Sequence, residues 1–182
     1  MRRVGVAACC FVAMGVRAQG AGEAGRIPEV HGISFAEQAV NLPEILKGKV
    51  GVLVVGFSHG SQDQVMGWGK RLAGDYRDSP TVVYYEMPVL ASVPRMLRGF
   101  VEGKIKDSVP DAARARFVPL LENEAAWRTV AHYKGGDDAY VLVVDEHGVV
   151  RWETQGAATD ASSGALKERV EALGAGMGQA GR

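Results

Sequence analysis

Cysteine is nearly absent from this chain of 182 residues, which holds only Cys9 and Cys10. Residues 11–182 contain no cysteine at all. The thiolate is the nucleophile of thiol–disulfide exchange, so a chain that has lost its first residues can form neither a disulfide nor a reactive thiolate. The fate of the N-terminal segment therefore decides whether cysteine redox chemistry is open to this protein.

Net charge is absent as well, because Lys and Arg together number 21 and so do Asp and Glu. An even balance provides no general basic field, and we expect no nucleic-acid partner. Apolar residues make up 47% of the chain and charged residues 23%, which is typical of a globular protein with a sizeable core. The length suits a single domain.

The N-terminus carries an apolar run that is too short to span a bilayer. Residues 4–16 form 13 uncharged positions, whereas a membrane span needs about 20. Arg2 and Arg3 precede the run, and Val16 and Ala18 place small residues where a signal peptidase reads. We predict a signal peptide over residues 1–18, with cleavage after Ala18 and export to the periplasm or the extracellular space. Cleavage removes 3 of the 21 basic residues and both cysteines.

Other interpretations of the N-terminus stay open. Residues 6–9 resemble a lipoprotein cleavage box, but too few residues separate them from the arginines. The arginine pair suggests twin-arginine export, although its surroundings do not match. A mitochondrial presequence is also rich in arginine and poor in acids, but it should be amphipathic. Mitochondrial localisation is the alternative to export, and a retained N-terminus would restore Cys9 and Cys10 as redox candidates.

The centre of the chain reads as a buried strand that leads into a helix. Residues 50–55 are an unbroken apolar and largely β-branched run, which is typical of a strand covered on both faces. A turn follows at residues 56–60, and a helix is predicted over residues 61–78. Ser61 and Gln64 have the spacing of a capping box, in which each side chain satisfies a free N–H of the first helical turn.

The remaining elements follow from local patterns. Residues 32–174 are expected to form one domain, after a flexible lead-in at 19–31 and before a frayed tail at 175–182. The predicted strands are a hairpin of residues 33–35 and 38–40, and segments 81–85, 116–120, 140–144 and 149–153. The predicted helices are a single turn at 42–46, a helix at 92–105, a short helix at 108–115 and a helix at 124–132 capped by Asn123. A last helix is capped by Thr159 or Asp160 and ended by Gly174. The first strand, helix and strand predict a parallel crossover.

The helix at residues 92–105 has a continuous apolar stripe. It consists of Met96, Leu97, Phe100, Val101 and Ile105, which recur at helical spacing.

The order of elements resembles the thioredoxin-like superfamily. Residues 40–49 (VNLPEILKGK) look like the entry segment of periplasmic members, and residues 140–148 (YVLVVDEHG) resemble the strand and turn that follow their cis-proline loop. The resemblance covers residues 32–173 and implies an α/β fold, a three-layer α/β/α sandwich with a central mixed sheet. Two features depart from it. Redox members carry C-x-x-C where residues 58–61 stand here, and a cis-proline at the position of Ala139.

A closer resemblance is to the mitochondrial ATP-synthase assembly-factor family, which also lacks the redox pair. Residues 140–145, 149–152 and 156–160 are similar to the C-terminal signature of that family, and the Arg151-Trp152 step is its most specific element. The resemblance implies help in assembling membrane-embedded ATP-synthase subunits, and thus a polypeptide partner in a membrane-associated complex.

Candidate chemistry is limited to the turn of residues 57–61. A hydroxyl of Ser58 or Ser61 beside His59 would provide a nucleophile and its base if they lay within about 3 Å. Adjacent side chains on extended backbone point apart, and Ser61 is explained as a helix cap. We therefore predict no catalytic residue, while an enzyme or a degenerate thiol–disulfide or peroxiredoxin-type protein acting at this turn remains the alternative.

No cofactor or metal is expected from the sequence. His31, His59, His132 and His147 lie on different predicted elements, whereas a metal needs converging ligands. Asp137 and Asp138 lack the alternating spacing of a calcium loop.

The predicted binding residues are drawn from three segments. They are Phe57, Ser58, His59 and Ser61 in the turn, Ala139 and Tyr140 at the cis-proline position, and Arg151 and Trp152 on the last strand. Arg151 and Trp152 point to opposite faces of that strand, so one of them is expected to be exposed. The prediction is an exported thioredoxin-like protein that holds a polypeptide or assembles a complex, and that is more consistent with a non-enzyme.

Overall fold

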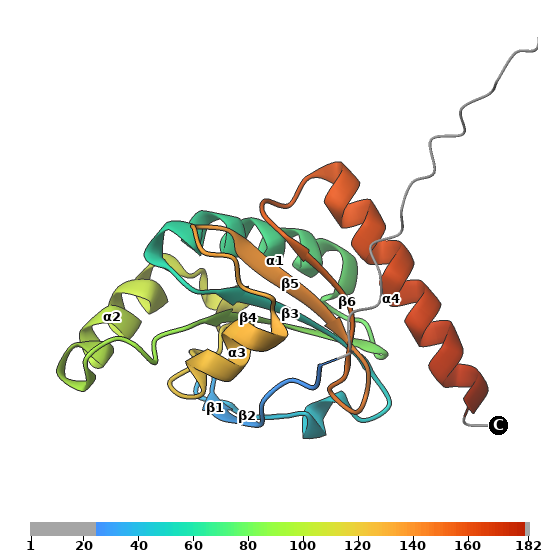
Figure 1. The fold of residues 1–182 in the computed structure, drawn as a ribbon, viewed down its shortest axis with the longest axis horizontal. Helices are drawn as coiled ribbons and strands as arrows, with labels where there is room; N and C mark the ends of the chain where they lie inside the picture. The colour runs from blue at the N-terminus through green and yellow to red at the C-terminus, as the bar shows by residue number, and fades with distance from the viewer. Residues whose placement is uncertain (1–24, 181–182) are drawn as a thin grey trace, which may run out of the picture.

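The computed structural model describes residues 25–180, and a four-stranded mixed sheet lies at its centre (Figure 1). The order of its strands is β4 (Val82–Pro88), β3 (Val50–Gly56), β5 (Ala139–Val144) and β6 (Val150–Gln155). β3 pairs parallel with β4 and antiparallel with β5, and β5 pairs antiparallel with β6. The predicted parallel crossover and central mixed sheet are confirmed. The predicted signal peptide lies outside the described residues.

The apolar run at the centre of the chain forms the centre of the sheet. Every residue of β3 is buried. Side chains alternate between the two faces of a strand, so a strand packed on both sides must be apolar at every position. Val52 and Val54 enter the core on one face, and Leu53 and Val55 enter the core on the other.

Two long helices cover one face of the sheet. They are α1 (Gln62–Tyr76) and α4 (Asp160–Ala180), seen above and to the right of the strands in Figure 1. α1 contributes Val65, Trp68, Leu72 and Tyr76 at helical spacing, and α4 contributes Leu166 and Val170. The Trp68 indole also donates a hydrogen bond of 2.8 Å from Nε1 to the Gly156 carbonyl, which ties α1 to the chain that leaves β6.

The other face carries the third layer. It is formed by α3 (Glu124–Val130), the β1–β2 hairpin (Val30–Ile33 and Ala39–Leu42) and a 3-10 turn, η1 (Glu44–Leu46). Its buried members include Val40, Leu42, Leu46 and Trp127. The predicted three-layer α/β/α sandwich is therefore confirmed.

α2 (Arg95–Ser108) projects from one end of the sandwich (Figure 1). None of its residues is buried. A 3-10 helix, η3 (Asp111–Arg116), leads from α2 back to the sheet. There the segment of residues 117–120 runs beside β4, with two isolated bridges in place of the predicted strand. N–H groups of Val118 and Leu120 donate to β4 carbonyls at 2.9 Å, so the outer edge of β4 is covered.

Two helix ends differ from the prediction. The last helix passes through Gly174 and continues to Ala180, because the residues on both sides of that glycine, Leu173 and Met177, pack on the core. The predicted cap Thr159 is confirmed, since its Oγ1 accepts the Ser162 N–H at 3.1 Å. Asn123 precedes α3 in the left-handed region (φ 58°) without a side-chain capping hydrogen bond.

The predicted lead-in also belongs to the fold in its last residues. Ile27 is buried, and its N–H donates to the Gly148 carbonyl at 2.9 Å. The Gly25 carbonyl accepts the Val150 N–H at 2.8 Å. Short apolar segments of this kind are hard to separate from a linker by composition alone. Among the helices of residues 25–180, none has both the length and the apolarity to cross a membrane.

Candidate functional site

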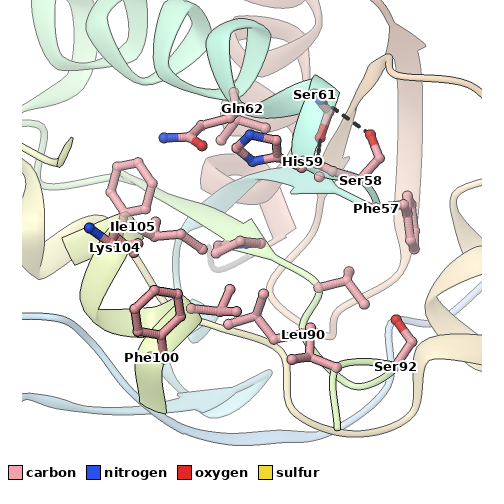
Figure 2. Close-up of a pocket in the computed structure, with 17 residues that line it drawn as sticks. Phe57, Ser58, His59, Ser61, Gln62, Leu90, Ser92, Phe100, Lys104 and Ile105 are labelled. Carbon is pink, nitrogen blue, oxygen red and sulfur yellow. Dashed lines mark hydrogen bonds between the residues drawn. The ribbon is translucent and has the colours of Figure 1, made fainter. Parts of the chain in front are cut away.

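The turn after β3 is closed by two serines that bond to each other. η2 (His59–Ser61) is a 3-10 turn that leads into α1, and Ser58 is its N-cap in extended conformation. Ser58 Oγ accepts the Ser61 N–H at 3.2 Å, and Ser61 Oγ donates to the Ser58 carbonyl at 2.8 Å (Figure 2). Ser61 does precede α1, as predicted, but its buried side chain makes no capping hydrogen bond to the helix, and Ser58 caps the 3-10 turn before it.

Gln64 is the second half of the predicted capping box, and it too has a different role. Its Oε1 accepts the Ala139 N–H at 3.0 Å, and its Nε2 lies 3.4 Å from Asp138 Oδ1. Proline has no N–H, so this bond requires a residue other than proline at position 139. The side chain of Gln64 therefore joins the start of α1 to the start of β5.

Asp137 completes the closure of the turn. Ser58 Oγ donates to Asp137 Oδ1 at 2.7 Å. The same carboxylate packs against Gly60, where an added Cβ would overlap it. A carboxylate is favourable here because the first N–H groups of a helix point toward it.

His59 stands apart from both hydroxyl groups. The Ser58 hydroxyl donates to Asp137 and the Ser61 hydroxyl donates to a backbone carbonyl, and neither bonds to the imidazole. His59 is exposed. The two serines therefore make structural hydrogen bonds. They do not form the nucleophile–base pair with His59 that was considered from the sequence.

Phe57 points to the other side of the turn, into an aromatic cluster with Tyr133 and Tyr140. Its ring centroid lies 4.7 Å from that of Tyr133 and 5.5 Å from that of Tyr140. The Arg128 guanidinium lies 4.3 Å from the centroid of Tyr133. The Tyr140 hydroxyl accepts the Lys134 N–H at 3.0 Å. The predicted binding residues Phe57 and Tyr140 are thus buried core residues that pack against each other beside the turn.

A cavity of about 640 Å³ opens beside this turn, between α1, the chain after β4 and α2 (Figure 2). One wall is the turn itself with His59 and Gln62. The opposite wall is α2, which contributes Phe100, Lys104 and Ile105. Residues from the chain after β4 complete the lining; they are Pro88, Val89, Leu90, Ser92 and Val93. We call this space the α2 groove.

Arg151 and Trp152 lie away from the α2 groove. Trp152 pairs with Val143 on β5, and Val143 is four residues from Ala139, so about 13 Å along the strand separates it from the turn. Trp152 is half-buried against the core under α4. Arg151 faces the other way, with its Nε donating to Asp145 Oδ2 at 2.8 Å. The structure therefore brings together only the turn residues with Ala139 and Tyr140.

The Asp145–Arg151 pair fixes the hairpin between β5 and β6. Asp145 Oδ1 also accepts the N–H groups of His147 and Val149, both at 2.9 Å. Burial alone would raise the pKa of Asp145, but these N–H groups and the Arg151 guanidinium outweigh it and lower the pKa. Arg151 therefore has a structural role in this hairpin.

Glu86 is a buried acid that the sequence analysis did not single out. It lies on β4, is 2% exposed and faces α1. Within residues 25–180 its carboxyl group has no hydrogen-bond or ion-pair partner, and burial raises its pKa to about 8. A lone acid inside the strand VVYYEMP was the available signal. In the part of the chain that the structure describes, no three His, Cys, Asp or Glu residues gather as a metal site would require.

The chain is similar to one known protein family over most of its length. Residues 17–173 match the family model described as ATP10 protein. The chain belongs to the ATP10 family. The resemblance of residues 140–160 to the ATP-synthase assembly-factor family is thereby confirmed. A search of curated proteins found no match.

Solved structures place the ATP10 chain in the thioredoxin fold. A putative thiol:disulfide interchange protein DsbE from Chlorobium tepidum is 15% identical with a TM-score of 0.58, over 85% of this chain and 99% of that one. The exposed lipoprotein thioredoxin Etrx1 from Streptococcus pneumoniae is 9% identical with a TM-score of 0.58, over 80% and 100%. BsSco, of the Sco family of cytochrome c oxidase assembly proteins, is 13% identical with a TM-score of 0.57, over 84% and 95%. At these identities the likeness shows the fold alone.

Proposed function

We propose that this ATP10-family protein is an exported, non-catalytic assembly factor that binds a polypeptide of the complex being assembled in the α2 groove. The observation that carries the proposal is the position of the groove. It opens on the same turn at which redox relatives carry their thiols, and this turn holds Ser58 and Ser61 instead. The scaffold thus presents a surface at the usual site without the sulfur nucleophiles.

The bonding of the turn supports a binding role. Both serine hydroxyl groups are held by Asp137 or by the backbone, and Gln64 anchors Ala139. These three hydrogen bonds hold the turn in one conformation, and a preorganised surface reduces the entropy lost when a partner docks. The apolar lining of the groove supplies the surface that such a partner would bury.

Export is the proposed route to the site of assembly. It rests on the arginine pair, the short apolar run of residues 4–16 and the cleavage position after Ala18. Mass spectrometry of the mature protein from its native cell is expected to find Gln19 at the N-terminus. An intact Met1 terminus in the functional protein would overturn export by this signal, and would return Cys9 and Cys10 to the mature chain.

Site-specific photocrosslinking tests the binding proposal. Benzoylphenylalanine would replace Phe100, which lines the groove, or Lys70, an exposed position of α1 that does not. We expect ultraviolet light to join an ATP-synthase subunit to the protein labelled at position 100 and not to the protein labelled at 70. Equal yields from both positions, or no ATP-synthase subunit from position 100, would contradict the proposal.

A further inference from the structure

α2 has an apolar face of which only the last residue, Ile105, packs on the core. Leu97, Phe100, Val101 and Ile105 fall at positions i, i+3, i+4 and i+8, which place them on one side of a helix. A stripe of this kind normally enters a core, yet Leu97 is 51% exposed and Phe100 is 67% exposed. Phe100, Val101 and Ile105 line the α2 groove. The part of the stripe around Leu97 and Phe100 is therefore open to solvent, while Ile105 joins it to the core.

The far side of the same helix has a different character. Gly99, Glu102, Gly103 and Lys106 line a second, more polar groove toward β1. An added Cβ at Gly99 or Gly103 would meet nothing within 4 Å. The two sides of α2 thus differ in their chemistry, because the groove toward β1 has many more polar groups in its lining than the α2 groove has.

The α2 groove is long enough for a short stretch of polypeptide. Phe100 and Ile105, which both line it, are five helical steps apart, or about 7.5 Å along α2. Two or three residues of an extended chain, at about 3.3 Å each, would cover that length.

The charges around the groove select the occupant further. Lys104 and His59 are its ionisable lining residues, and no carboxylate lines it. The Lys104 ammonium lies 5.6 Å from the centroid of the Phe100 ring, at the mouth of the apolar stripe. Among residues 25–180 no carboxylate pairs with Lys104, whereas Lys106 on the other side of α2 pairs with Glu37 at 3.7 Å. A free cation beside apolar side chains is complementary to an anion within an apolar ligand.

We propose that the α2 groove binds an apolar polypeptide segment that carries an acidic side chain opposite Lys104. This inference rests on the proposed function and names the chemistry of its partner. Leucine-sized side chains of the segment would cover the stripe from Leu97 to Ile105, and the carboxylate would accept a hydrogen bond from the Lys104 ammonium. The outer edge of β4 beside the groove is not used, because residues 117–120 already bond to it.

The test measures binding of short fluorescein-labelled peptides by fluorescence anisotropy. The peptides consist of leucine and serine and differ only in one central residue, which is Glu, Gln or Lys. We expect the Glu peptide to bind about threefold to tenfold more tightly than the Gln peptide, and the Lys peptide to bind most weakly. Equal affinities for all three would overturn the acidic preference and leave the proposed function, which the crosslinking tests separately.

Charge reversal provides the matched variants. Lys104→Glu is expected to invert the order of the Glu and Lys peptides, while Lys70→Glu on α1, with the same change in net charge, is expected to preserve it. Both positions are exposed, and circular dichroism would confirm that both variants fold. If Lys104→Glu fails to fold, the three peptides on the unchanged protein still decide the matter. Inversion by Lys70→Glu as well would show a nonspecific charge effect and overturn the proposal.

A competition arm separates a polypeptide from a lipid-like anion. Sodium decanoate offers a carboxylate and an apolar chain without a peptide backbone. We expect it to displace the Glu peptide only at concentrations about 100-fold higher than the unlabelled peptide, because it covers less of the stripe. Displacement by decanoate at the same concentration as the peptide would identify the groove as an acyl-chain site and overturn the proposal.

Discussion

The carboxyl group of Glu86 on β4 lies directly against Gly69 on α1, so closely that a Cβ atom at position 69 would overlap it. The absence of a side chain at Gly69 therefore makes room for a buried acid. Gly69→Ala should force the carboxyl group or the helix to move and lower the free energy of unfolding by about 1–3 kcal/mol. Urea denaturation measures this.

Gly67→Ala and Gly74→Ala are the controls for that substitution. Both residues lie on the same helix, and a Cβ at either would meet nothing within 4 Å. Glycine in a helix interior costs about 0.5–1 kcal/mol relative to alanine, so these variants should be stabilised by that amount. Stabilisation of Gly69→Ala to the same degree would contradict the close packing with Glu86.

The buried acid also predicts how stability depends on pH. Burial raises the folded-state pKa of Glu86 to about 8, above its ordinary value of 4.5. Between these pH values the folded state holds a proton that the unfolded state has lost. The free energy of unfolding is therefore not reduced by Glu86 below pH 4.5, and it decreases as the pH rises from 4.5 to 8. The loss at pH 7 is on the order of 3 kcal/mol.

Glu86→Gln removes this titration and keeps the shape of the side chain. The free energy of unfolding of the variant, relative to the unchanged protein, should therefore rise steadily from pH 5 to pH 8. Urea titrations across that range provide the measurement. If the two proteins keep a constant difference at every pH, Glu86 titrates normally and the account of its burial is wrong.

The bond between Ala139 and Gln64 predicts the effect of restoring the proline of redox relatives. Ala139→Pro removes the N–H that donates to Gln64 Oε1 and should cost about 1–3 kcal/mol of stability. In a Gln64→Ala background that bond is already lost, so the same proline should cost clearly less. Equal cost in both backgrounds would show that the hydrogen bond contributes nothing.

The absence of thiols predicts that the protein has no disulfide reductase activity. Two serine-to-cysteine substitutions would introduce a pair of thiols. The chain from Gln19 onward has no cysteine and should reduce insulin no faster than the dithiothreitol blank. Ser58→Cys combined with Ser61→Cys places two thiols at C-x-x-C spacing across a helix start, where the helix lowers the pKa of a thiol. The double variant should form an intramolecular disulfide, seen as loss of both free thiols on oxidation. Turnover by the unsubstituted chain above the blank would contradict the prediction.

The sequence predicts those parts of the fold that local chemistry determines. The complete burial of β3 follows from its unbroken apolar run, and the alternating exposure of β6 follows from its alternating residues. The capping residues are harder to predict from sequence, because Ser58 and Ser61 are equally able to accept a hydrogen bond. Only the path of the turn decides which of them faces a free N–H. Gly174 was misread for a related reason, since the packing of Leu173 and Met177 outweighs its weak helix propensity.

Only part of the candidate site could be predicted from the sequence. The turn of residues 57–61 could be located because it joins a buried strand to a helix. The apolar stripe of α2 was visible too, but a stripe states only that a face is apolar and not whether anything covers it. Exposure of Phe100 and its place across the groove from His59 depend on how residues 89–94 lead away from β4, which no local pattern encodes.

The central claim is that the α2 groove carries the assembly function, and complementation tests it most directly. In a cell lacking this protein, Phe100→Asp places a charge on an exposed groove residue that the fold does not need. Arg151→Ala alters a signature residue outside the groove. Native gels of the membrane fraction should show assembled ATP synthase restored by Arg151→Ala and not by Phe100→Asp, with both variants present at equal levels. Full restoration by Phe100→Asp would contradict the account.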